Sequence, residues 1–69
     1  MREMWFIFDN LGNVFNDGDG TPDFEAAKND FINRFGSAEN AAGFTLCKVL
    51  EDGGCWVECL EEIAPDDIF

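Results

Sequence analysis

The sequence contains no histidine and no tyrosine, and only four of its 69 residues are basic. Histidine is the side chain that most often acts as a general acid or base near neutral pH. The sequence also has no glycine-rich phosphate-binding loop and no nucleophile paired with a base. We therefore expect no enzymatic activity, no catalytic residue and no cofactor.

Long apolar runs are also missing. No stretch approaches the ~18 apolar residues that a membrane-spanning helix needs, and the N-terminal apolar run is too short for a signal peptide. The cysteines are few and odd in number, namely Cys47, Cys55 and Cys59. These features favour reduced thiols and a cytoplasmic location, although they leave one disulfide open.

The composition nevertheless supports a folded core. Hydrophobic residues make up 46% of the chain, with eight phenylalanines and two tryptophans, which is too apolar for a disordered acidic tail. The length fits a single domain over residues 1–69. Its stability should be modest, because so short a chain buries only about 60% of the surface that it exposes when unfolded.

One helix is expected within "TPDFEAAKNDFINRFG", residues 21–36. Thr21 is a typical N-cap, Pro22 suits the first helical position, and Gly36 ends the segment. The apolar residues recur at helical spacing and form one stripe: Phe24, Ala27, Phe31 and Phe35.

Strands are expected at residues 3–9, 44–50 and 55–63, with a possible short return strand at 13–16. The first strand is apolar on both faces, which is typical of a central or covered strand. Pro65 begins a tail. We predict an α+β fold in the order β(β)αββ: a three- or four-stranded antiparallel sheet with one α-helix packed on one face.

The last two strands are joined by "EDGG", a hairpin signal whose register stays open. One possibility is a two-residue turn at Asp52 and Gly53. The other is a three-residue loop that sets Lys48 opposite Glu58 and Cys47 opposite Cys59. In both registers, Glu58 and Glu62 share a face and Glu61 lies on the other.

The segment "NDGDGTPDFE", Asn16–Glu25, has the composition of a calcium loop. An EF-hand needs glycine at position 6 and glutamate at position 12. One alignment places Phe15 at position 1 and Ala26 at position 12, and the other places Pro22 at position 6 and Lys28 at position 12. The segment is therefore interpreted as an acidic loop before a helix, with a calcium-binding module at Asp17–Glu25 kept as an alternative.

The cysteine spacing matches no common zinc pattern, and no histidine can complete such a site. In a regular strand, Cys55 and Cys59 point to the same face. We interpret the cysteines as small buried hydrophobic residues and expect no metal ligands.

Charge is the strongest signal in the sequence. Fifteen acids against four bases give a net charge of −11. Residues 1–48 hold eight acids and all four bases (−4), whereas residues 49–69 hold seven acids and no base (−7). Such a surface repels nucleic acid and anionic membranes and attracts a basic protein. The candidate partner-binding residues are Glu51, Asp52, Glu58, Glu61, Glu62, Asp66 and Asp67, with Asp17 and Asp19 as a second group.

In size, acidity and order of elements, the chain resembles small phage-encoded anti-CRISPR proteins of the acidic, DNA-mimic kind. The segments "EDGGCWVECLEEIAPDD" and "NDGDGTPDFE" carry this resemblance. It implies an inhibitor that blocks the DNA-binding surface of a CRISPR effector complex, with a type I complex (Cascade) as the candidate partner, in the host cytoplasm. No catalytic residue is implied.

Two further expectations concern assembly. We expect a monomer rather than a dimer. An acidic interaction protein without inhibitory activity is a second alternative, and it would use aromatic surface at Trp5 or Trp56.

Overall fold

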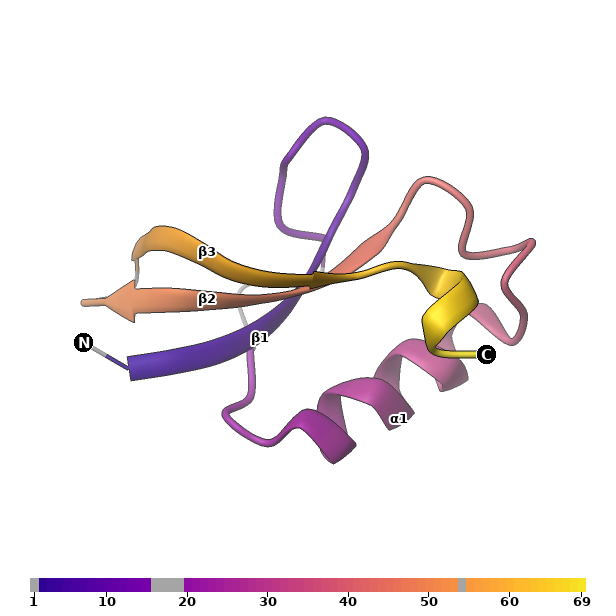
Figure 1. The fold of residues 1–69 in the computed structure, drawn as a ribbon, viewed down its shortest axis with the longest axis horizontal. Helices are drawn as coiled ribbons and strands as arrows, with labels where there is room; N and C mark the ends of the chain where they lie inside the picture. Colours follow the sequence, from indigo (N-terminus) through magenta and orange to yellow (C-terminus); the bar gives the residue numbers. More distant parts are fainter. Residues whose placement is uncertain (1, 16–19, 54) are drawn as a thin grey trace.

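The computed structural model describes residues 2–15, 20–53 and 55–69. Its elements are β1 (Arg2–Phe8), α1 (Phe24–Phe35), β2 (Thr45–Asp52), β3 (Cys55–Ile63) and a 3-10 turn, η1 (Pro65–Asp67). The strands form one antiparallel sheet in the order β1-β2-β3, and α1 crosses beside it (Figure 1). The α+β class and the antiparallel sheet are confirmed.

The two apolar faces of β1 suggested a central or a covered strand, and the structure shows a covered one, because β2 occupies the middle of the sheet. The chain covers the outer edge of β1 itself. The backbone N–H of Trp5 donates to the carbonyl of Thr21 at 2.7 Å, and the N–H of Phe15 donates to the carbonyl of Ile7 at 2.7 Å. Around Val14 the described residues form only an isolated bridge to Phe8 rather than a return strand.

The two faces of the sheet are distinguished by their β1 and β2 residues. Trp5, Ile7 and Leu46 belong to one buried cluster, together with Ala27 and Phe31 of α1. We call this side the Trp5 face. The expected helix stripe is confirmed, since Phe24 and Phe35 pack against the same cluster. Trp5 therefore belongs to the core, with 6% of its surface exposed, and offers no aromatic docking surface.

The second cluster contains Met4, Phe6 and Phe8 of β1 with Cys47 and Val49 of β2. We call this side the Phe6 face. Gly20 lies against the Phe6 ring so closely that an added Cβ would come within 2.6 Å of a ring carbon. Trp56 of β3 meets Phe8 edge to face, with 5.6 Å between ring centroids. These contacts explain why both sides of β1 are apolar.

The N-cap of α1 is Asp23, not Thr21. The Asp23 side chain accepts a hydrogen bond from the backbone N–H of Glu25, whereas the Thr21 hydroxyl accepts one from the N–H of Asp23. Asp23 takes the N-cap position because it directly precedes the first helical residue. From there its side-chain oxygen can accept a hydrogen bond from a free N–H of the first turn. The C-terminal prediction is confirmed: Gly36 has φ 81° and its N–H donates to the Ile32 carbonyl.

Neither expected hairpin register occurs. Asp52 pairs with Cys55, Leu50 with Glu58, Lys48 with Glu61 and Cys47 with Glu62. The register shifts twice, which leaves Val57 and Leu60 as the unmatched residues of two bulges. Each bulge adds one residue to β3 and reverses which face the following side chains occupy.

The residues after Pro65 are not a loose tail. Ile68 is buried in the cluster of the Trp5 face, and the Phe69 ring lies 6.0 Å from that of Phe31. In Figure 1 the C-terminal turn accordingly sits above α1. Within the described ranges, no helix has both the length and the apolar character that crossing a membrane would require.

Phe31 has none of its surface exposed and joins α1 to the sheet. Replacing Phe31 with Ala should lower the free energy of unfolding by about 3–5 kcal/mol, since a large aromatic side chain leaves a cavity. Urea unfolding followed by circular dichroism measures this change. Leu11→Ala is the control, because Leu11 is 81% exposed and its loss should change stability little. Equal effects of the two substitutions would contradict this core.

Candidate functional site

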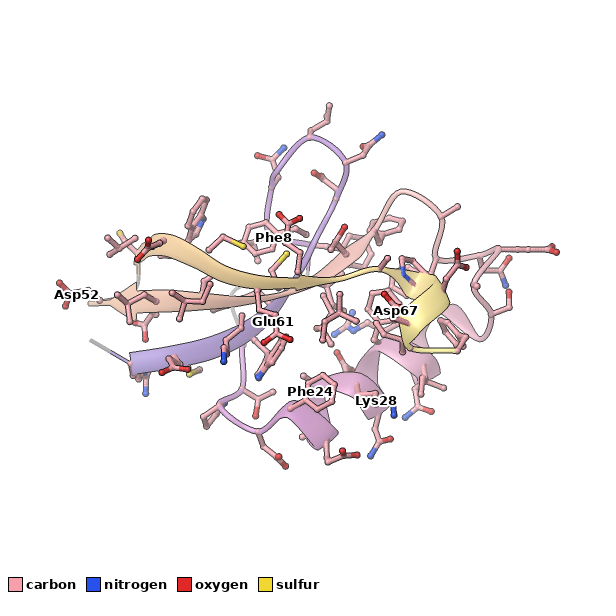
Figure 2. The ribbon with its side chains drawn as sticks, viewed as in Figure 1. Phe8, Phe24, Lys28, Asp52, Glu61 and Asp67 are labelled. Atoms are coloured by element: carbon pink, nitrogen blue, oxygen red, sulfur yellow. The ribbon has the colours of Figure 1, made fainter. Side chains whose placement is uncertain are left out.

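Five acids outline an exposed strip along one side of the molecule. Glu58 and Glu61 lie on the Trp5 face of β3, because they pair with Leu50 and Lys48. Asp52 ends β2, and η1 supplies the remaining two. Figure 2 shows Asp52, Glu61 and Asp67 spread along the length of the molecule. We call this set the acidic strip: Asp52, Glu58, Glu61, Asp66 and Asp67.

The faces occupied by the β3 glutamates differ from the expected arrangement. Glu58 and Glu61 share a face, and Glu62 lies on the other, which is the reverse of the expectation for Glu61 and Glu62. The reason is the bulge at Leu60, which adds a residue between Glu58 and Glu61. All three glutamates are exposed.

Lys48 forms an ion pair with one acid of the strip. Its Nζ lies 3.8 Å from Glu61 and 3.3 Å from Glu3, and its side chain is 28% exposed. Exposed ion pairs of this kind contribute little to stability and leave each carboxylate hydrated. Lys48 therefore partly neutralises the charge of Glu61, but the Glu61 carboxylate stays accessible to a partner.

Glu51 is separated from the other predicted acids by its burial. Only 8% of its surface is exposed, and its carboxylate pairs with the guanidinium of Arg2 across the β1–β2 ladder. A buried acid that already has a cationic partner offers little accessible charge to a docking protein. Glu51 thus serves the fold rather than the exposed surface.

The loop acids Asp17 and Asp19 lie outside the described residues, so the calcium alternative stays a prediction. Within the described part of that loop, the Asp23 carboxylate caps α1 and Glu25 is exposed in the first helical turn. The dipole of the helix favours acids at both positions. Their structural roles explain why they are acidic.

β3 itself is the last strand of the sheet, and it is exposed almost throughout. Its apolar residues Trp56, Val57 and Leu60 are 47%, 56% and 43% exposed. The sequence suggested a regular strand with one buried face. The two bulges remove that regularity, and no residue pattern in the sequence marks them.

A second group of chemically active side chains lies on the Phe6 face. The Sγ atoms of Cys47 and Cys59 and a carboxylate oxygen of Glu62 all lie within 4.8 Å of one another. The Cys59 thiol is 3.9 Å from Glu62 Oε1 and 3.8 Å from the Glu61 carbonyl. We call these three residues the thiol–carboxylate cluster.

The cluster lines a cavity of about 320 Å³. Phe8, Asp9 and Trp56 contribute to the walls of the same cavity. Figure 2 shows Phe8 on the side of the sheet away from Phe24 and Lys28 of α1. The cavity is thus separated from the helix by the sheet.

Burial raises the pKa of the Cys47 thiol from 9.0 to about 12, with the neighbouring Cys59 and Glu62 adding to the effect. A low-dielectric site disfavours the thiolate, and nearby negative groups disfavour it further. Cys47 is therefore held as a neutral thiol next to the cavity.

The sequence interpretation of the cysteines is correct for Cys47 and wrong for the other two. Cys55 and Cys59 are exposed, and they occupy opposite faces because the bulge at Val57 lies between them. Sequence spacing could not reveal the cluster. Cys47 and Glu62 meet only because they are paired across the β2–β3 ladder.

This arrangement predicts an order of thiol reactivity. At pH 8, iodoacetamide should modify Cys47 at least about tenfold more slowly than Cys55 or Cys59, because the thiolate is the nucleophile and Cys47 is both buried and raised in pKa. Peptide mass spectrometry over time measures the three rates. In denaturant the three cysteines should react alike, and a fast Cys47 in the folded protein would contradict the cluster.

Comparison with known proteins finds no matching family model, no matching curated protein and no matching solved structure. No function can therefore be transferred to this chain from a relative. The two groups that distinguish the described surface are the acidic strip on one side of β3 and the thiol–carboxylate cluster on the other.

Proposed function

We propose that this protein is a non-enzymatic inhibitor that presents the acidic strip to a basic, nucleic-acid-binding surface of another protein. The observation that carries the proposal is the exposure of all five strip carboxylates, on the edge strand β3, on the adjoining turn η1 and at the end of β2. Residues 49–69 contain no lysine or arginine, so the strip has no basic residue of its own segment to neutralise it.

A nucleic-acid-binding groove is lined with lysine and arginine that would otherwise neutralise phosphates. Carboxylates held on a strand are a suitable competitor, because the sheet fixes the backbone that carries them and little backbone order has to be created on binding. We infer that α1, which packs on the Trp5 face beside the strip, holds the sheet in shape when the strand edge docks.

The exposed apolar residues of β3 would add to this contact. Val57 and Leu60, the two bulge residues, are exposed next to the β3 acids and would bury apolar surface in this contact, whereas Trp56 leaves β3 on the Phe6 face. The charges would then set the rate and specificity of docking, and the apolar contacts its lifetime.

The resemblance to acidic, DNA-mimic anti-CRISPR proteins supplies the candidate partner, namely the DNA-recognition surface of a type I effector complex in the host cytoplasm. The protein would act there as a monomer. The calcium-binding alternative rests largely on Asp17 and Asp19, which lie outside the described residues, so the acidic strip is the better-supported basis for a function.

The direct test is a mobility-shift assay of target duplex DNA with a purified type I effector complex. The protein should prevent DNA binding at low salt and lose potency as salt rises, because screening weakens interactions between exposed charges. Inhibition that does not change with salt would contradict charge mimicry. No inhibition would exclude this partner.

The variant Glu58→Gln/Glu61→Gln should inhibit at least about tenfold less well, since it removes two strip charges that steer binding. The matched control is Glu25→Gln/Glu39→Gln, which changes the net charge by the same amount at exposed positions outside the strip. Circular dichroism verifies that both variants fold. Equal losses in the two variants would mean that only total charge matters and that the strip is not the contact surface.

A further inference from the structure

The thiol–carboxylate cluster is assembled from two strands by the bulged register. Cys47 and Glu62 are directly paired, so their side chains leave the sheet on the same face. Cys59 pairs with Val49, the next residue on that face of β2. The bulge at Leu60 brings Cys59 and Glu62 close together, although a regular strand would place them on opposite faces.

The distances suit a tetrahedral ion. Zinc binds thiolates at about 2.3 Å and carboxylate oxygens at about 2.0–2.2 Å, so two such ligands on one ion lie roughly 3.5–3.8 Å apart. The Cys59 Sγ and Glu62 Oε1 atoms are 3.9 Å apart, and all three ligand atoms lie within 4.8 Å of one another. Contraction by about 1 Å or less would complete the three contacts.

The surroundings favour a cation. The walls of the cavity include Asp9 and contain no lysine or arginine among the described residues, while the chain as a whole carries a charge of −11. Two sulfur ligands select a soft or borderline metal over calcium or magnesium. The cluster thus differs in chemistry from the calcium loop that the sequence suggested.

We propose that Cys47, Cys59 and Glu62 bind one zinc-type divalent cation, with the fourth coordination position facing the cavity of about 320 Å³. Both thiol protons leave to solvent as the two metal–sulfur bonds form. Asp9 is not among the residues whose ligand atoms converge, and its Oδ1 accepts hydrogen bonds at 2.9 Å from the N–H groups of Leu11 and Asn13. The fourth position is open to water or to a small ligand.

This site is separate from the proposed inhibitory surface. Its ligands leave β3 on the Phe6 face, whereas Glu58 and Glu61 leave it on the Trp5 face. Metal binding can therefore be tested without any partner protein, and its failure would leave the acidic strip unaffected.

The experiment uses cobalt(II) as a spectroscopic substitute for zinc, with the whole protein reduced, treated with chelator and kept free of oxygen. Titration should produce the intense visible bands of tetrahedral cobalt and a sulfur-to-cobalt charge-transfer band, saturating at one equivalent. Zinc should then remove both signals by displacing cobalt. Bound metal should also raise the thermal midpoint, since it binds the folded state.

Three substitutions locate the site. Cys59→Ser should abolish the charge-transfer band of tightly bound cobalt, and Glu62→Gln should weaken binding at least about tenfold, because each removes a ligand. Cys59 and Glu62 are exposed, so both variants should fold. Cys55→Ser and Glu61→Gln are the matched controls, since these residues lie on the Trp5 face and should leave binding unchanged.

The proposal fails if the reduced wild-type protein gives no cobalt spectrum, or if Cys55→Ser loses the spectrum as fully as Cys59→Ser does. Air oxidation could join Cys47 to Cys59 and block cobalt binding. The proposal also fails if the protein, once that disulfide has been reduced, still takes up no cobalt. Mass spectrometry after alkylation identifies such a disulfide. Unchanged affinity in Glu62→Gln would overturn the assignment of the carboxylate ligand.

Discussion

The pairing of β2 with β3 is the constraint on which both candidate sites depend. Two bulges, at Val57 and Leu60, change the face of β3 side chains twice within nine residues. They place Glu58 and Glu61 together on the Trp5 face and bring Cys59 and Glu62 together on the Phe6 face. A β3 of regular pleat would mix these groups and would form neither the strip nor the cluster.

β3 contributes few buried side chains to the core and is held mainly by its hydrogen-bonded pairing with β2. Its last residue, Ile63, packs against the buried cluster of the Trp5 face. An exposed edge strand is an aggregation hazard, and charged side chains and bulges are known protections against it. The acids and bulges of β3 therefore have a structural use as well as a proposed functional one. The matched variants in the binding assay separate these two uses.

Sequence reasoning captured what local chemistry dictates. The helix stripe of Phe24, Ala27, Phe31 and Phe35 and the Gly36 terminus follow from spacing and backbone preference, and both are found. The sequence left open whether β1 is central or covered, because β1 is at least as apolar as β2, and the covering of β1 by Thr21 and Phe15 depends on tertiary contacts. The burial of Glu51 was missed for a related reason, since its partner Arg2 is 49 residues away.

The candidate sites were accessible from sequence to different degrees. The acidic strip could be anticipated, because a segment with seven acids and no base must expose most of them. The face of β3 on which each acid lies could not be anticipated, because no residue type in the sequence marks a bulge. The cluster was hidden for the same reason: Cys47, Cys59 and Glu62 form no spacing motif and meet only through the register.

The two proposed activities are electrostatically compatible. Replacing two thiol protons by one divalent cation exchanges equal positive charge, so metal binding would leave the net charge of −11 unchanged. The attraction of the strip for a basic partner would thus persist with metal bound. The ion would also link Cys47 of β2 to Cys59 and Glu62 of β3, and so fix the edge strand that carries Glu58 and Glu61. A metal on the Phe6 face would in this way stabilise the geometry of the acids on the opposite face, while taking none of their charge.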